Sequence, residues 1–248
     1  MSESESQLRR RIRRWVRPLA STPLHPQWLL NRRGPDRYSW ATPQITGRVL
    51  DVGCADGPIR NRLAAGVDYV GLDYPATADG LYRTKPQVFG SAERLPFCDA
   101  CFDTVVILDV LEHIASPTEA IGELARVTKP GGILLLTIPY GYPLHDAPHD
   151  YQRLTRFALQ RSLASAGFGQ LDIQEVGTAH HTAGLARSLS LANWVLRAVS
   201  APGLRSLMIP VALALIPVTN LLGALLAGLF PVSDFFPMGY RVRAERRR

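Results

Sequence analysis

Cysteine and lysine are scarce in this chain, which has three cysteines and two lysines among its 248 residues. Three cysteines are too few for a secreted disulfide scaffold. The chain opens with Ser and Glu followed by arginines, without the apolar run of a secretory signal peptide. Glycine and proline follow no period, and 46% of the residues are apolar, which excludes collagen-like and disordered chains. We therefore expect one main globular domain in a reducing, cytoplasmic setting.

The positive charge is concentrated at the two ends of the chain. Residues 1–48 carry ten arginines against three acids, and residues 236–248 carry five arginines against one acid. Residues 49–235 carry 13 basic and 17 acidic side chains. Basic ends suit an anionic partner, either nucleic-acid phosphates or anionic lipid headgroups, and charge alone leaves both open.

Residues 1–45 are expected to form a basic helical extension. Apolar side chains recur there at helical spacing among six arginines, before a stop at Pro18. These apolar residues are Leu8, Ile12, Trp15 and Val16. Such a stripe is typical of a helix lying in a membrane interface. The alternative, equally weighted, is a helix packed on the domain with its arginines in water.

Residues 48–57 predict a strand followed by a glycine-rich turn. Gly53 and Gly57 let the backbone come close to a ligand, and residues 58–65 are expected to be helical. A second strand, Asp68–Asp73, ends about 20 residues on in an acid that can accept both ribose hydroxyls. The pair indicates an adenosyl-type ligand in an α/β sheet. A nicotinamide or flavin enzyme is disfavoured, because the turn is Gly-x-x-x-Gly and not Gly-x-Gly-x-x-Gly.

Five motifs follow one another in order over residues 48–178. They are Val49-Leu-Asp-Val-Gly-Cys-Ala-Asp-Gly57, the strand end Asp73, Gly90-Ser-Ala-Glu-Arg-Leu-Pro-Phe97, Phe102-Asp-Thr-Val-Val106 with Val110-Leu-Glu-His-Ile114, and Lys129-Pro-Gly-Gly132 before an apolar strand. In this order the chain resembles the class I S-adenosylmethionine-dependent methyltransferases, in the branch called methyltransferase type 11. The resemblance implies a Rossmann-like seven-stranded sheet with helices on both faces, and S-adenosyl-L-methionine as the cofactor.

The resemblance also implies which residues hold the cofactor. It places the methionine end over the glycine-rich turn, the ribose on Asp73, and the adenine between Tyr74 and the turn at Ser91. Ser91 departs from the family pattern, which has an acid there, although its hydroxyl can still bond to adenine. Asp51 would hold the turn or meet the amino-acid ammonium, and His113 would face the methyl group or begin a helix. The full set is Asp51, Gly53, Cys54, Ala55, Gly57, Asp73, Tyr74, Ser91, Ala92, Glu93, Asp109 and His113.

Two other local patterns are interpreted as structural. Ser116, Pro117 and Glu119 predict a helix start with a capping box. Cys98-x-x-Cys101 has the spacing of a metal or redox motif, but no second Cys or His pair flanks it. We interpret it as a surface turn.

A polar loop, residues 139–155, follows the apolar strand at the sheet edge where open α/β folds bind ligands. The candidates to orient or deprotonate an acceptor hydroxyl are His145, His149, Asp150 and Tyr151. For the last two, bonding the loop to a helix capped by Thr155 is an equal alternative. The two histidines have the i, i+4 spacing of metal ligands on a helix, but Pro148 argues against a helix and methyl transfer needs no metal. We therefore expect no metal.

An apolar insertion, residues 179–236, separates the last two strands, which are expected near 171–176 and 239–244. Its first part has the pattern of an amphipathic helix, and residues 206–233 contain no charge. Pro210, Pro217 and Asn220 are expected to break this run into halves too short to cross a bilayer. The insertion would then be a re-entrant or interfacial hairpin on the inner leaflet. The alternative is a helical lid or dimer interface buried in protein.

The resulting layout is a basic extension (1–45), a methyltransferase domain (46–178 and 237–248) and the insertion (179–236). The leading hypothesis is methylation of a hydroxyl on a lipid-linked or amphiphilic small molecule or glycan, by a cytoplasmic protein peripheral or monotopic at the inner face of the membrane. A nucleic-acid methyltransferase is disfavoured, because Leu108-Asp-Val-Leu111 lacks the Asn/Asp-Pro-Pro-aromatic turn of base-amino methylators. A non-catalytic, cofactor-binding partner in a membrane complex is the third hypothesis.

Overall fold

The computed structural model describes residues 16–31, 36–77, 85–201 and 203–248. Its contacts divide the chain into two compact units. The sheet unit contains Pro35–Tyr140, Leu144–Glu175 and Gly239–Arg248, and the hairpin unit contains Met1–Gly34, Gly141–Pro143 and Val176–Met238. The expected amphipathic helix from Leu8 onward lies almost wholly outside the described residues.

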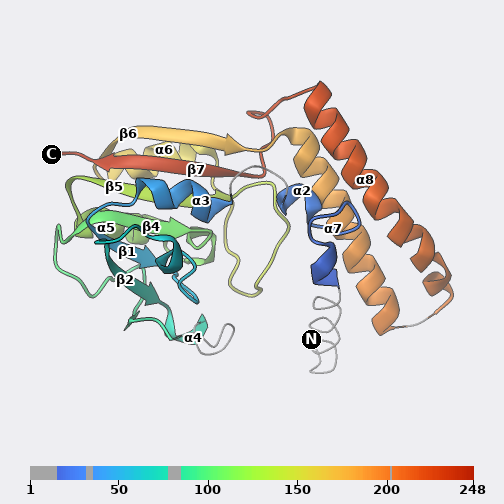
Figure 1. The fold of residues 1–248 in the computed structure, drawn as a ribbon, viewed down its shortest axis with the longest axis horizontal. Helices are drawn as coiled ribbons and strands as arrows, with labels where there is room; N and C mark the ends of the chain where they lie inside the picture. The colour runs from blue at the N-terminus through green and yellow to red at the C-terminus, as the bar shows by residue number, and fades with distance from the viewer. Residues whose placement is uncertain (1–15, 32–35, 78–84, 202) are drawn as a thin grey trace. The chain divides into compact units, whose positions relative to one another are not determined.

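One seven-stranded sheet forms the centre of the sheet unit (Figure 1). Its strands are β1 (Arg48–Val52), β2 (Asp68–Asp73), β3 (Val88–Phe89), β4 (Phe102–Leu108), β5 (Thr128–Pro139), β6 (Phe168–Val176) and β7 (Gly239–Arg246). Their order is β3-β2-β1-β4-β5-β7-β6, in which β3 to β5 are parallel and β7 is antiparallel to β5. The expected fold, with an antiparallel final strand after an insertion, is confirmed.

Both faces of the sheet are covered, because side chains alternate along the buried strands. In β4, Val105 and Ile107 join the apolar cluster that contains α5 (Pro117–Val127) and α6 (Arg156–Ser165). Val106 and Leu108 join a second cluster. That cluster includes residues from α3 (Arg37–Ala41) and from the segment before the short 3-10 turn η3 (Arg60–Arg62). The remaining short elements of this unit are η2 (Thr42–Gln44), α4 (Pro75–Thr77) and η5 (Leu111–His113).

The prediction of a helix over residues 58–65 is wrong. Only the single turn η3 follows the glycine-rich turn, and Leu63 is already extended. A segment of this length is below the ~12 residues at which an isolated helix becomes stable. Ile59 alone is fully buried there, so packing does not rescue it. Ligand contacts at this point must therefore come from loop amides and not from the end of an α-helix.

The two predicted helix caps have different outcomes. Ser116 is at the N-cap of α5, but its side chain makes no cap hydrogen bond, so the predicted capping box is wrong. Its backbone is outside the extended geometry that a cap requires, and its N–H donates to Glu93 Oε1 at 2.8 Å. Thr155 caps α6 as predicted, since its hydroxyl accepts from the Ala158 N–H.

The hairpin unit is built around two long helices that pack side by side (Figure 1). They are α7 (Ala179–Ser200) and α8 (Ile209–Leu229), joined through η6 (Leu204–Met208), and the unit also holds η1 (Arg17–Leu19) and α2 (Trp28–Asn31). The helices approach closely where Gly184 faces Gly223, because a Cβ on either glycine would lie within 3.3 Å of the other's Cα. Asn220 is fully buried and donates to the carbonyls of Pro23 and His25.

The predicted break of the apolar run into two halves is wrong. α8 continues for 21 residues through Pro217. Pro210 is in its first turn, where a missing N–H is tolerated, and Asn220 is satisfied by bonds outside the helix. A helix of this length spans about 31 Å, close to the roughly 30 Å of bilayer hydrocarbon.

Helix α8 exposes most of its large apolar side chains, whereas a helix of a soluble protein buries them. Its buried positions are Ala212, Ile216, Asn220, Gly223 and Ala227. Its exposed positions include Val211, Leu215, Val218, Leu222, Leu225 and Leu229. Residues 204–229 contain an 18-residue window with a mean hydropathy of 2.1 and are the one stretch, among those described, that is long and apolar enough to cross a membrane. Three of the five buried positions are thus Ala or Gly, whereas the large apolar residues of α8, apart from Ile216, mostly face outward.

Replacing Asn220 by Leu, which has the same number of side-chain heavy atoms and the same branching, should destabilise the hairpin unit by about 1 to 3 kcal/mol, because the partly buried carbonyls of Pro23 and His25 lose this donor. Leu221→Asn is the matched control, since it makes the reverse exchange at the neighbouring, exposed position and should change stability by less than about 0.5 kcal/mol. Urea unfolding in mild detergent, with amide hydrogen exchange of α8, measures both. Equal stability of the two variants would contradict the bridging role.

Candidate active site

The predicted cofactor residues gather at the edge where β1, β2 and β4 end. Because these strands are parallel neighbours, their carboxyl ends meet at one edge of the sheet. The strand order reverses between β1 and β4, and open α/β sheets bind ligands at such a point.

The turn after β1 is shaped by close backbone packing. Gly53 has φ +75°, and a Cβ added there would lie 2.3 Å from the Val110 side chain, so only glycine fits. The amides of Gly53 and Cys54 both donate to the carbonyl of Leu72. Ala55 is also left-handed, with φ +45°. The turn is thus held against β2 on one side and the segment after β4 on the other.

Asp73 connects the turn to the end of β2. Its Oδ2 accepts from the Ala55 N–H at 3.0 Å and its Oδ1 accepts from the Tyr74 N–H at 2.7 Å. The carboxylate is buried, whereas the Tyr74 ring is more than half exposed beside it. Each carboxylate oxygen can accept a further hydrogen bond. The pair therefore offers an acceptor for hydroxyls next to an aromatic surface.

The turn at Ser91 is closed by its own side chains. The Glu93 N–H donates to Ser91 Oγ at 3.2 Å, and Ser91 pairs with Arg94 across a short antiparallel bridge. Ala92 is buried beneath the turn. Glu93 Oε1 accepts from the Ser116 N–H, which ties the turn to the start of α5. The Ser91 hydroxyl thus accepts a hydrogen bond within its own turn.

Two buried groups beside the turn have strongly shifted pKa values. Desolvation raises the pKa of Asp51 to about 7, although a hydrogen bond from the Tyr69 hydroxyl opposes the shift. Burial, with the nearby charges of Asp51 and Asp73, raises the pKa of the Cys54 thiol to about 12. Asp51 is bonded to β2 and not to the turn. Cys54 is therefore a neutral packing group at ordinary pH.

Asp109 is held by two partners at the end of β4. Its Oδ2 pairs with Arg37 of α3, and its Oδ1 accepts from the Thr137 hydroxyl at 2.7 Å. Its backbone is left-handed, with φ +54°. Sequence reasoning missed Arg37, because its place beside Asp109 depends on a contact 72 residues apart.

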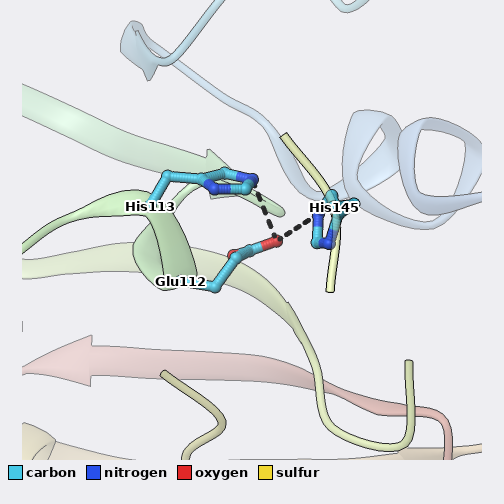
Figure 2. Close-up of side chains that lie close together, drawn as sticks. All are labelled: Glu112, His113 and His145. Carbon is cyan, nitrogen blue, oxygen red and sulfur yellow. Dashed lines mark ion pairs between the residues drawn. The ribbon is translucent and has the colours of Figure 1, made fainter. Parts of the chain in front are cut away.

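Beyond Asp109, two histidine side chains converge on the carboxylate of Glu112 (Figure 2). Glu112 Oε1 lies 3.8 Å from Nε2 of His113 and 3.8 Å from Nε2 of His145. Glu112 has 0% of its side chain exposed. Desolvation, with the nearby charge of Asp109, raises the pKa of Glu112 to about 8. Sequence reasoning named both histidines but missed Glu112, because it marked Glu112 only as part of a family motif.

The polar loop before α6 is organised by an ion pair. Asp150 receives two hydrogen bonds from Arg153 and one from the His145 N–H. Burial by itself would raise the pKa of Asp150, but these hydrogen bonds and the nearby Arg153 charge lower it to about 2. Asp150 Oδ2 lies 3.2 Å from His145 Nδ1. At such a pKa Asp150 is a weak base. It contacts both the backbone N–H and the ring of His145, so its position suits a residue that orients His145.

The other two loop candidates are near solvent. Nδ1 of His149 lies 3.1 Å from the Tyr151 hydroxyl, and the Tyr151 ring is more than half exposed. The Tyr151 N–H donates to the Glu112 carbonyl, so the loop is tied to the segment after β4. Residues 144–151 are not helical, as Pro148 predicted, and His145 is paired in space with Glu112.

Comparison with known proteins supports one assignment. The family model described as "Methyltransferase domain" matches residues 50–136. The ubiquinone biosynthesis O-methyltransferase of Burkholderia pseudomallei is 30% identical over 211 residues, covering 73% of this chain and 87% of that protein. The chain belongs to the class I S-adenosylmethionine-dependent methyltransferases. S-adenosylmethionine is the cofactor of this methyltransferase family.

Two further proteins resemble this methyltransferase, one in the sequence of part of the chain and the other in fold. An uncharacterised methyltransferase of Mycobacterium tuberculosis is 37% identical over 105 residues, which is 40% of this chain and 43% of that protein. The chain thus spans less than half of that relative's length. The Haemonchus contortus phosphoethanolamine N-methyltransferase 2, solved with S-adenosyl-L-methionine, has 16% identity and a TM-score of 0.53, covering 93% of this chain and 59% of that one. This likeness shows the fold alone.

Ionisation of Asp51 should make the stability of the methyltransferase depend on pH. Its pKa is about 7 in the folded protein and about 4 in an unfolded chain, so stability falls as pH rises through this window. Asn at this position cannot ionise. Between about pH 5 and pH 8, the free energy of unfolding of the wild type should fall by about 2 to 3 kcal/mol relative to Asp51→Asn.

Urea unfolding at several pH values measures this difference. Asp68→Asn, at the exposed start of β2, is the control and should run parallel to the wild type. If the profile of Asp51→Asn also ran parallel to the wild type, the buried carboxyl would not have the raised pKa.

Proposed function

We propose that this protein transfers a methyl group from S-adenosylmethionine to a hydroxyl of a lipid-linked or amphiphilic acceptor at a membrane surface. The observation that carries the proposal is the outward-facing apolar side of α8. Exposed leucines and valines on this scale are costly in water and mark a surface that contacts lipid or protein. A soluble acceptor would not require such a surface.

The hairpin supports attachment to one side of a bilayer. α8 has the length of a membrane span, but the chain returns through β7 to the same sheet as β6. α7 carries Arg187 and Arg197, which are costly inside hydrocarbon. We therefore infer that α8 lies against or within one leaflet while α7 remains at its surface. The arginine-rich ends of the chain favour the cytoplasmic, anionic leaflet.

The similarity to the Burkholderia protein is consistent with an oxygen acceptor. That relative is named an O-methyltransferase of ubiquinone biosynthesis, so the similarity extends to a protein whose name states methylation at oxygen. The acceptor of the present chain follows only by analogy. It is the apolar surface of α8 that adds an argument from this chain itself.

The residues at the ends of β1 and β2 fit the cofactor. The backbone at Gly53 and Gly57 is left-handed and carries no side chain, which lets a ligand come close. Asp73 would accept hydrogen bonds from the ribose hydroxyls, and Tyr74 would lie against the adenine. Asp51, partly protonated near neutral pH, and Asp109 would bind the polar amino-acid end.

The acceptor side requires alignment and proton removal. S-adenosylmethionine, when bound, supplies a methyl group on a sulfonium that is already a good leaving group. The loop would align the acceptor and exclude water. His145 or His149 would take the hydroxyl proton, since an imidazole titrates in the useful range. We assign Asp150 to positioning His145, because its ion pair with Arg153 makes it a weak base.

Cofactor binding tests the first half of the proposal. Asp73→Ala should weaken the binding of S-adenosylmethionine and S-adenosylhomocysteine by roughly 10- to 100-fold, because charge-assisted hydrogen bonds to the ribose are lost. Asp68→Ala removes the same residue type from the exposed start of β2 and should leave the affinity unchanged. Titration calorimetry on the full chain measures both. Absence of binding to the wild type would overturn the enzyme assignment.

Vesicle binding tests the second half. Leu222→Glu and Leu225→Glu on the exposed face of α8 should together reduce co-sedimentation with phosphatidylglycerol vesicles by at least about tenfold, since burial of two leucines is lost and two charges are added. Phe157→Glu on α6 is the control, because it changes an apolar residue outside the hairpin that is more exposed than either leucine, at 73% against 44% and 58%.

The lipid composition and the oligomeric state separate the alternatives. Binding to phosphatidylglycerol but not phosphatidylcholine would support attraction by the basic ends. If the wild type sedimented with neither vesicle and formed a dimer that the double variant broke, the α8 surface would be a protein interface and not a lipid contact.

A further inference from the structure

We infer that Glu112, His113 and His145 form a binding site for a divalent transition-metal ion. One ligand atom from each lies within 4.8 Å of the others (Figure 2). Nitrogen and oxygen ligands of such an ion lie about 2.1 Å from it and hence about 3 to 3.4 Å from one another. Small inward movements of the side chains would complete this geometry. The inference departs from the expectation that the protein uses no metal.

The carboxylate of Glu112 lacks the partners that its burial requires. Its side chain is 0% exposed, and neither oxygen has a hydrogen-bond partner among the described residues. A buried carboxylate is normally hydrogen-bonded, paired or bound to metal. The two imidazole nitrogens at 3.8 Å are too far away for hydrogen bonds but are placed to share an ion with it.

Contacts on the outer side of each ring direct Nε2 toward the same point. Nδ1 of His113 lies 2.7 Å from the carbonyl oxygen of His149. A carbonyl only accepts, so Nδ1 carries the proton and Nε2 of the neutral ring is an electron-pair donor. Nδ1 of His145 lies 3.2 Å from Oδ2 of Asp150, which Arg153 holds in place; this is ion-pair distance without hydrogen-bond geometry, so a small rotation of the ring would complete the bond. A carboxylate behind a histidine is the usual support of a metal ligand.

The donor set indicates which ions would bind. Two imidazoles and one carboxylate suit Zn²⁺, Mn²⁺, Fe²⁺ or Co²⁺, whereas Mg²⁺ prefers oxygen ligands. Three protein ligands leave coordination positions open, and the histidines are 21% and 27% exposed, so a further ligand can enter. Resting on the proposed function, the ion would bind the acceptor oxygen and lower the pKa of its hydroxyl. His149 would then take the proton, because Nε2 of His145 would be occupied as a ligand.

Metal binding is tested without acceptor or activity. Untagged full-length protein is stripped with a chelator and titrated with Zn²⁺ by calorimetry and with Co²⁺ by visible absorption. We expect one ion per chain and weaker binding of Mg²⁺. Glu112→Gln and His145→Gln should each weaken Zn²⁺ binding by at least about 100-fold, and Asp150→Asn by about 10- to 100-fold. The visible absorption bands of bound Co²⁺ should be absent in Glu112→Gln and His145→Gln.

Two control variants remove rival ligands. His149→Gln keeps the backbone carbonyl that contacts His113, and Cys98→Ser removes an exposed thiol. Both should leave the Zn²⁺ affinity unchanged within about twofold. The inference is overturned if the wild type binds no Zn²⁺ or Co²⁺ stoichiometrically, if binding survives Glu112→Gln and His145→Gln, or if His149→Gln weakens it equally.

S-adenosylmethionine binding to each metal-free variant reports folding and separates this inference from the proposed function. A variant that keeps cofactor affinity but loses the metal supports the site. If Glu112→Gln does not fold, the partly exposed His145→Gln decides. Metal binding without any cofactor binding by the wild type would refute the methyltransferase proposal alone, and cofactor binding without metal would refute the metal site alone.

Discussion

The desolvation of carboxylates at the ends of parallel strands is the constraint on which the site depends. Asp51, Asp73 and Glu112 are all buried at the edge where β1, β2 and β4 end. A buried carboxylate must accept hydrogen bonds, bind a cation or take up a proton. Asp73 accepts two backbone amides, whereas Asp51 and Glu112 have pKa values raised to about 7 and about 8. The same edge is therefore prepared for ligands that supply donors or positive charge.

This constraint also explains why the loops around the edge are tightly connected. Gly53 packs against Val110, which leads directly into η5 and Glu112. The Tyr151 N–H donates to the Glu112 carbonyl, so the loop after β5 is joined to the same segment. The residues proposed for the cofactor and those proposed for the acceptor are thus linked through the short segment after β4.

The hairpin unit follows a different physical rule. A buried apolar cluster that includes Trp28, Leu29 and Leu185 fills its interior, the α7–α8 contact is made by glycines and the polar bridge of Asn220, and large apolar side chains of α8 face outward. This is the arrangement expected when close helix packing and hydrogen bonding hold a helix pair whose outer surface is not in water. The exposed side is therefore explained more simply by a lipid or protein partner than by folding of the chain.

Much of the fold followed from the sequence, because strand alternation, glycine-rich turns and the Thr155 cap are set by neighbouring residues. β2 was predicted to the residue, and both strands around the insertion were located. The helix expected over residues 58–65 and the break in α8 were wrong, since burial decides whether a short segment is helical and packing lets a helix continue through Pro217. Tertiary structure alone placed Arg37 beside Asp109 and His145 beside Glu112, because the members of each pair are far apart in the chain. Arg37 reaches Asp109 from α3, and the loop that carries His145 reaches Glu112 because β4 and β5 are parallel neighbours that end at the same edge of the sheet.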